Sequence, residues 1–207
     1  HLLSRRQRQM CIRDSAYYLA SPANWIIVLF PQKYMIEIMN TLIILKLSLS
    51  SVSMTHYISR HFSNKNICIA LFGLFYAFSG YVAAYSWNIM WLDCMWLLPF
   101  IILGLDRLVT ERKYKMYCIA LALGIFSNYY IGIMLCIYSV IYFVYLICVS
   151  DFDEEIGNVK GRLLAFKDFA IYSVLGGGLA ACVILPEYFN LLTTKSADTS
   201  FPDLSLI

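Results

Sequence analysis

Charged residues are scarce in this 207-residue sequence and make up only 14% of it. A water-soluble domain typically carries about 25% charged residues, so this chain has too little polar surface to cover a soluble globule. The same scarcity excludes a disordered chain and an arm that binds nucleic acid. Hydrophobic residues make up 60% of the sequence, and the mean hydropathy is +0.67. These values predict an all-α polytopic transmembrane helix bundle whose main partner is the lipid bilayer.

Several motifs that carry chemistry in other proteins are also missing. The seven cysteines include no Cys-X-X-Cys pair, so we expect them to act as small hydrophobic residues and not as zinc ligands. The run Gly176-Gly177-Gly178 is not followed by Lys and Ser or Thr, so it is not a phosphate-binding loop. Close helix packing or a flexible point within a span is the better interpretation of these glycines.

The net charge of +3 comes entirely from the first 15 residues, and the rest of the chain is neutral overall. The sequence begins with His, and the letters RQMCIRDS resemble a translated sequencing adapter. We interpret residues 1–15 as a non-native leader; the alternative is a short basic cytoplasmic leader. Residues 16–207 are expected to form a single integral membrane domain, itself a fragment of a larger one.

Six stretches approach the roughly 20 apolar residues that a membrane-spanning helix needs. The uncharged run from Met116 to Ser150 is too long for one span, so we divide it at Ser127–Tyr130. The six predicted spans are residues 34–58, 67–86, 91–109, 115–130, 131–149 and 168–186.

Charge supports this division of the chain. With six spans the basic loops 59–66, 107–115 and 150–167 all fall on one side, which the positive-inside rule assigns to the cytoplasm. Residues 16–33 contain an apolar core bounded by Pro22 and Pro31 that is too short to cross a bilayer. We interpret this segment as a re-entrant or interfacial turn.

Ionisable residues within or beside a predicted span are candidates for function, because placing charge in a membrane is costly. Lys46 lies near the middle of its span, Asp93 near the outer start of another, and Glu187 at the outer end of the last. Lys46 is either the counter-charge for a lipid phosphate or pyrophosphate, or one half of a structural ion pair or a snorkelling side chain.

Asp93 has the most informative surroundings, since Trp87, Asn88 and Trp91 precede it. Indole rings can stack on a sugar, and a carboxylate can accept hydrogen bonds from hydroxyls or help to hold a divalent metal. The alternative is a belt of interfacial aromatic residues, with Asp93 as the N-cap of a helix.

The turn at Asn128 and Tyr129 offers hydrogen bonds to a polyol, although the same residues suit an ordinary turn between helices at the headgroup level. His56 and His61 are five positions apart, which is not a helical metal pair, so we expect them to be interfacial histidines.

Four segments resemble the YfhO family of bacterial membrane proteins. They are Tyr17–Pro22 (YYLASP), Tyr76–Tyr81 (YAFSGY), Ser86–Asp93 (SWNIMWLD) and Ser127–Gly132 (SNYYIG). The resemblance extends over residues 16–207, and the SWNIMWLD and SNYYIG segments are its most specific parts.

The resemblance implies a glycosyltransferase of the GT-C type in the bacterial plasma membrane, with its active face outside the cytoplasm. Such an enzyme passes a sugar from a polyprenyl-phosphate carrier to an acceptor such as teichoic acid in the cell wall. The family pattern also places a catalytic Asp in an external loop that would precede this chain, so the fragment alone is expected to be inactive.

Under this hypothesis a carboxylate deprotonates the acceptor hydroxyl, and Asp93 is the candidate catalytic residue. Lys46 or a divalent metal would meet the phosphate charge, although no metal ligand is assigned and no cofactor is certain. The candidate substrate-binding residues are Lys46, Trp87, Asn88, Trp91, Asn128, Tyr129 and Glu187. The alternative functions are a transporter or flippase for a lipid-linked precursor, or a non-catalytic membrane component.

Overall fold

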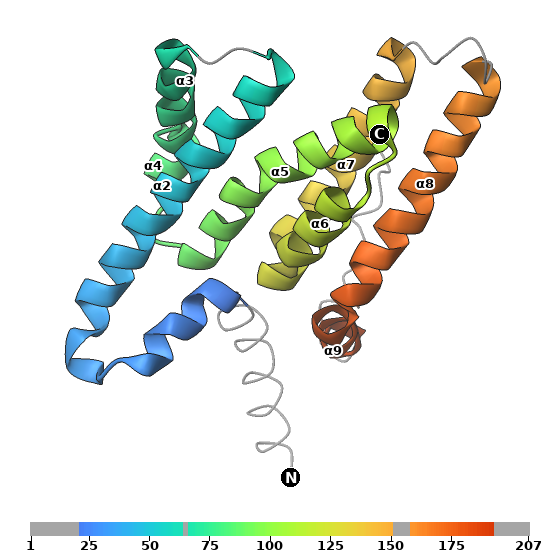
Figure 1. The fold of residues 1–207 in the computed structure, drawn as a ribbon. Coiled ribbons are helices and arrows are strands. Elements are labelled where there is room, and N and C mark those ends of the chain that lie inside the picture. Colours follow the sequence, from blue (N-terminus) through green and yellow to red (C-terminus); the bar gives the residue numbers. More distant parts are fainter. Residues whose placement is uncertain (1–20, 64–65, 151–157, 193–207) are drawn as a thin grey trace, which may run out of the picture.

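The computed structural model describes residues 21–63, 66–150 and 158–192, and every regular element in these ranges is a helix (Figure 1). The predicted all-α class is therefore confirmed for the described part of the chain. The leader expected at residues 1–15 lies outside the described residues.

Two short 3-10 helices, η2 (Pro22–Leu29) and η3 (Gln32–Tyr34), precede the first long helix. Pro22 begins η2 and Pro31 immediately precedes η3, where a fixed φ and a missing N–H are both tolerated. At about 2 Å of rise per residue, η2 is far too short to cross a bilayer, as expected from the sequence.

Helix α2 (Met35–His61) contains the predicted span 34–58 almost entirely and extends about one turn beyond it. The span predicted at residues 67–86 consists instead of two helices, α3 (Ile67–Ala77) and α4 (Gly80–Tyr85). The break falls at Phe78 and Ser79, just before Gly80. Serine and glycine are weak helix formers, and such pairs are common places for a helix to kink.

The long uncharged run is divided where the sequence predicted. Helix α6 (Lys115–Ser127) ends and α7 (Tyr129–Val149) begins on either side of Asn128. The side-chain oxygen of Asn128 accepts a hydrogen bond from the backbone N–H of Ile131 at 3.0 Å and so caps α7. This cap explains why two helices form where the composition alone would allow one.

The last predicted span is displaced. Helix α8 (Asn158–Leu179) occupies much of the stretch expected as the loop 150–167, and α9 (Ala181–Leu192) follows it, so the prediction of one span at 168–186 is wrong. The basic residues of this stretch suggested a loop. The helix accommodates them, because Ala165 and Phe169 are buried against the bundle while Arg162 and Lys167 are exposed.

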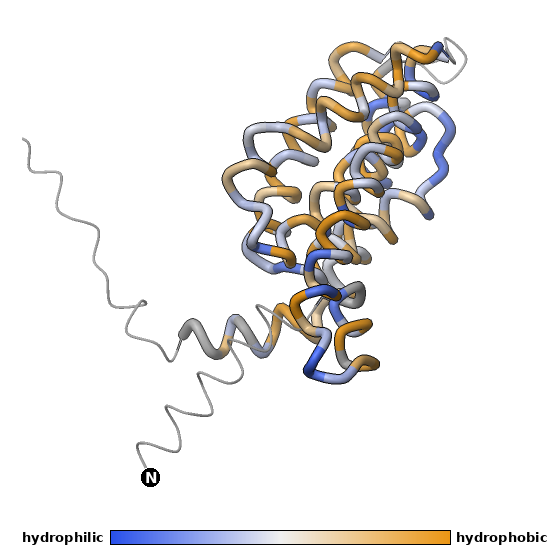
Figure 2. Tube along the Cα trace, turned by 90° about the vertical axis from the view of Figure 1, so that its left-hand side faces the viewer, coloured by the Kyte–Doolittle hydropathy of each residue, from blue (hydrophilic) through white to orange (hydrophobic). Residues whose placement is uncertain are grey.

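Four helical segments of the described chain are long and apolar enough to cross a membrane: Gln32–His61, Ile67–Tyr85, Ile89–Glu111 and Tyr129–Val149. Helix α6 is apolar but shorter, and α8 carries charged residues in its first half. The predicted bundle is thus confirmed, although its span count is not six. Figure 2 shows hydrophobic residues along the helices and hydrophilic residues mainly towards the ends of the bundle.

The chain runs up and down through α2, the α3–α4 pair, α5, α6, α7 and α8 in turn, which gives the bundle two distinct ends (Figure 1). The C-terminal ends of α2, α5 and α7 and the N-terminal ends of α3, α6 and α8 lie at one end, which we call the basic end (Figure 1). The α4–α5 and α6–α7 connections lie at the other, together with η2 and α9. We call it the aromatic end after Trp87, Trp91 and Tyr130. The described parts of the predicted basic loops 59–66 and 107–115 therefore lie at the same end, whereas residues 158–167 of the predicted loop 150–167 belong to α8, which begins there.

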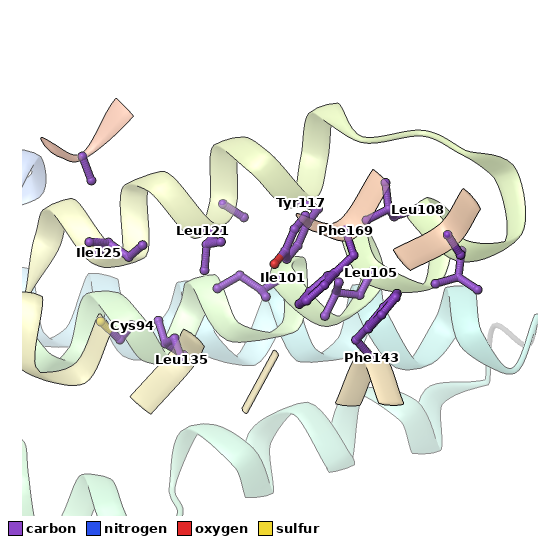
Figure 3. Packing of buried hydrophobic residues seen from close by; sticks show 14 residues of the cluster. Cys94, Ile101, Leu105, Leu108, Tyr117, Leu121, Ile125, Leu135, Phe143 and Phe169 are labelled. Carbon is purple, nitrogen blue, oxygen red and sulfur yellow. The ribbon is translucent and has the colours of Figure 1, made fainter. Parts of the chain in front are cut away.

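Helix α5 (Ile89–Glu111) is the centre of the bundle. In its most apolar window 67% of the residues are buried, against 17–22% in the other three spanning segments. It packs against α2, α6 and α7. In Figure 3 its side chains Ile101 and Leu105 meet Tyr117 of α6 and the stacked rings of Phe143 (α7) and Phe169 (α8), whose centroids are 4.0 Å apart.

Helices α5 and α6 approach each other to backbone contact at Gly104. A Cβ atom at this position would lie 2.6 Å from both the N and Cα atoms of Tyr117. Small residues allow this kind of close approach between helices in a membrane. The contact fixes α5, and therefore the residues at both of its ends, relative to the rest of the bundle.

Candidate functional site

Lys46, in the middle of α2, is buried in the bundle with only 1% of its surface exposed. Its ammonium nitrogen lies 2.9 Å from Oδ2 of Asp93. The same nitrogen donates to Oδ1 of Asn24 at 2.7 Å and to the carbonyl oxygen of Ile89 at 3.0 Å. An ammonium group has three donors, so all of its hydrogen-bonding capacity is used.

Asp93 lies in the second turn of α5 and is equally buried. Its Oδ2 accepts hydrogen bonds from the hydroxyl of Ser21 and from Lys46, and its Oδ1 accepts one from Nε1 of Trp96 at 3.3 Å. A buried carboxylate is costly unless it is paired and hydrogen-bonded, and here both conditions are met. We call Ser21, Asn24, Lys46, Asp93 and Trp96 the polar network.

The polar network joins three parts of the chain that are distant in sequence. Ser21 immediately precedes η2 and Asn24 lies within it, Lys46 belongs to α2, and Asp93 belongs to α5. One sequence alternative made Asp93 a helix N-cap. Asn88 occupies that position instead, because Asp93 is a full turn inside the helix and its charge is engaged by the ammonium. The network therefore holds η2 against the bundle.

The network does not provide a metal site. Oxygen atoms of Asp93, Asn24 and Ile89 surround the ammonium of Lys46, which already supplies the positive charge at this place. Within residues 21–63, 66–150 and 158–192, no three His, Cys, Asp or Glu side chains are grouped so that they could hold a metal ion. The divalent metal considered from the sequence has no ligand set among these residues.

Aromatic rings lie beside the polar network at the start of α5. The ring of Trp91 is half-buried and lies between Tyr85 and Tyr130, with centroids 5.3 and 6.4 Å away. The structure thus brings together the SWNIMWLD and SNYYIG segments. Trp87 behaves differently, because its ring is 71% exposed and its Nε1 donates to the carbonyl of Ala84 at 3.1 Å.

Two buried N–H donors at the aromatic end have no acceptor among the described residues. They are Nε1 of Trp91 and Nδ2 of Asn128, and Asn128 is completely buried. Leaving such a donor without a partner costs about 1–3 kcal/mol, so an unpaired donor points to a missing acceptor. Tyr130 links the two donors, since it stacks on Trp91 and lies two positions after Asn128.

The other predicted site residues are more dispersed. Asn88 is buried at the start of α5. Tyr129 lines an apolar cavity of about 210 Å³ between α6, α7 and α9. Glu187 lies within α9, but its side chain is outside what the structure describes. The structure therefore joins Lys46 to Asp93, and Trp91 to the turn at Asn128, without joining all of the predicted residues in one pocket.

Sequence reasoning missed the partners that complete the polar network. Ser21 and Asn24 were noted only as part of an interfacial turn, although two polar residues beside an apolar run are a signal for buried hydrogen bonding. It also missed Asp106 at the other end of α5. Asp106 accepts a hydrogen bond from the hydroxyl of Tyr142 at 2.8 Å and lies 3.3 Å from Nδ1 of His61.

Comparison with known proteins assigns the sequence to a family. The family described as "Bacterial membrane protein YfhO" matches residues 10–205. A curated relative, the "Uncharacterized protein YfhO" of Bacillus subtilis (strain 168), is 25% identical over 154 residues. The match covers 72% of this chain but only 17% of the relative, so the chain spans a small part of that protein's length. No solved structure matches the chain.

Proposed function

The chain belongs to the YfhO family of bacterial membrane proteins, and we propose that it forms part of a membrane glycosyltransferase. The complete enzyme would transfer a sugar from a polyprenyl-phosphate carrier to an acceptor outside the cytoplasm, such as teichoic acid. The proposal concerns the whole protein, since the chain covers only 17% of the matched relative. It places the aromatic end on the extracytoplasmic side of the plasma membrane, opposite the basic end.

The observation that supports this proposal best is the pair of unpaired donors at the aromatic end. The N–H groups of Trp91 and Asn128 lack acceptors within the described residues and lie beside a stack of aromatic rings. A sugar has hydroxyl oxygens that accept hydrogen bonds and an apolar face that packs on an aromatic ring. We infer that these two donors and the ring of Tyr130 bind the sugar or its polyol acceptor.

Asp93 and Lys46 have a second role in the proposal. The carboxylate of Asp93 would accept the proton of the acceptor hydroxyl, while Lys46 would neutralise the departing phosphate. In the described arrangement all three donors of the Lys46 ammonium are engaged, and the buried carboxylate of Asp93 accepts hydrogen bonds from Ser21, Lys46 and Trp96. An acceptor hydroxyl can therefore reach Asp93 only if a covering residue such as Ser21 moves away, and we take the arrangement with η2 in place as the resting one.

The test uses the full-length parent protein and measures sugar transfer from a polyprenyl-phosphate donor. Trp91→Phe keeps the ring but removes its N–H, and Asn128→Asp keeps the oxygen that caps α7 but removes its N–H₂. Losing one hydrogen bond to the substrate should lower kcat/KM by about 10-fold in each variant. Trp87→Phe is the matched control, because the Trp87 indole already has an acceptor in Ala84.

Two results would contradict the proposal. Transfer at the wild-type rate in both Trp91→Phe and Asn128→Asp would remove the unpaired donors from the site. Wild-type turnover in both Asp93→Asn and Lys46→Met would remove the ion pair from the mechanism. Movement of the intact lipid-linked sugar without cleavage of its phosphate ester would instead favour a transporter.

A further inference from the structure

A second polar feature lies at the C-terminal end of α2, away from the network at the middle of the helix. A cavity of about 410 Å³ is lined by His56, Ser59, Arg60 and Ser63, all of which are polar. Its volume falls within the range of roughly 300–1,000 Å³ that is usual for small-molecule sites. The cavity lies at the basic end, about 15 Å along the helix from Lys46 at 1.5 Å per residue. It is therefore separate from the site of the proposed function.

The charge around this cavity is positive. The charges of Arg60 and Arg107 are both close enough to act electrostatically on His56. Neither arginine lies within ion-pair distance of a carboxylate in the described part of the chain. Asp106 is the acidic residue beside Arg107, but it is already engaged by His61 and Tyr142. A cavity with this surplus of positive charge favours an anionic ligand.

Its side chains suit one particular class of anion. A guanidinium donates two parallel hydrogen bonds to phosphate oxygens, and hydroxyl groups such as those of Ser59 and Ser63 can supply further donors. Ser59 now donates to the carbonyl of His56 at 3.1 Å and would turn towards the ligand. A phosphate diester can accept hydrogen bonds from all of these donors, and its negative charge offsets the positive charge of the cavity.

The position of the cavity identifies the source of the phosphate. It lies where α2 ends, and the apolar ring of Phe62, next in the chain after His61, is 69% exposed there. Exposed apolar side chains such as Val52 continue along α2 towards the middle of the bundle. A lipid would place its headgroup at such a polar rim and its acyl chains along this apolar surface.

We propose that the cavity formed by His56, Ser59, Arg60 and Ser63 binds the phosphate of an anionic lipid headgroup. The basic end then faces the leaflet that contains this lipid. Helix α2 is held by the lipid at its C-terminal end and by the polar network at Lys46, in its middle. Phosphatidylglycerol is a suitable probe, because it presents a phosphodiester with one negative charge.

The experiment measures binding of phosphatidylglycerol to the purified chain in zwitterionic detergent by native mass spectrometry. Arg60→Gln should weaken binding by about 10-fold, since it removes a charge-assisted hydrogen bond to phosphate. Arg60→Lys keeps the charge but loses the two-pronged geometry, so its effect should be intermediate. Arg162→Gln is the matched control, because Arg162 is also an exposed arginine near the basic end, in α8, but does not line the cavity.

Each outcome decides the proposal. A loss in Arg60→Gln with unchanged binding in Arg162→Gln supports it, provided that circular dichroism shows equal helicity. Equal losses in the two variants, or no loss in either, would overturn it, since binding would then reflect general surface charge. An inorganic phosphate arm separates the sources: if inorganic phosphate binds the purified chain in an Arg60-dependent way while phosphatidylglycerol does not, the site binds a free anion and the lipid assignment is wrong. Wild-type sugar transfer by Arg60→Gln in the parent protein would leave the two proposals independent.

Discussion

Helix α5 carries Asp93 near one end and Asp106 near the other, and these two carboxylates are held in different ways. Asp93, at the aromatic end, is buried and paired with an equally buried ammonium. Asp106, at the basic end, is partly exposed and is met by the hydroxyl of Tyr142 and the exposed ring of His61. The same helix thus combines a charged pair sealed from solvent with a looser group of neutral and titratable partners.

The difference shows where a change of charge is costly. At the aromatic end both Lys46 and Asp93 are buried and cannot be solvated by water, so each charge is stabilised by the other. At the basic end, side chains with substantial exposure keep contact with water or headgroups. Function that requires one fixed geometry suits the first environment, and binding that tolerates exchange of partners suits the second.

Removing the ammonium should give the largest effect on stability. Lys46→Met leaves Asp93 buried without its counter-charge, which is expected to cost about 3–5 kcal/mol of unfolding free energy. The measurement is unfolding of the chain in detergent, followed by loss of helicity. Lys46→Met combined with Asp93→Leu removes both charges and should recover much of this loss. If the double variant is less stable than either single variant, the pair is not the source of the effect.

Close packing, rather than charge, dominates further along α5 towards the basic end. Gly104→Ala should lower the unfolding free energy by about 1–3 kcal/mol, because the added Cβ would meet the backbone of Tyr117. Gly177→Ala is the matched control, since a Cβ at Gly177 would meet no atom within 4 Å. The same unfolding measurement applies. An unchanged or more stable Gly104→Ala variant would show that α5 and α6 can separate at no cost.

The sequence predicted where the helices of this chain lie better than it predicted which side chains meet between them. Hydropathy located α2, α5 and α7, and the turn residue Asn128 correctly separated α6 from α7. The start of α8 was missed because exposed basic residues on a helix look the same in a sequence as basic residues in a loop. The break between α3 and α4 depends on a single Ser-Gly pair, which hydropathy does not register.

The candidate site shows a similar limit. Charge in an apolar run singled out Lys46 and Asp93, but the pairing of two residues 47 positions apart depends on how α2 and α5 pack. Ser21 and Asn24 join them only because η2 folds back onto the bundle. Asp106 was overlooked because a charge at the end of a span looks like a boundary, and its partner Tyr142 is one of 16 tyrosines.

The smallest predicted effect tests the group around Asp106. Tyr142→Phe removes the hydroxyl that donates to Asp106 and lies 3.5 Å from the hydroxyl of Tyr57. One hydrogen bond to a charged group contributes about 1.5–3 kcal/mol when shielded, and the partial exposure of Asp106 should reduce the loss here to about 1 kcal/mol. Tyr145→Phe is the control, because Tyr145 is 56% exposed and lies one turn further along the same helix. A loss in Tyr142→Phe as large as that in Lys46→Met would contradict the contrast between the two ends, since both carboxylates would then depend equally on a single partner.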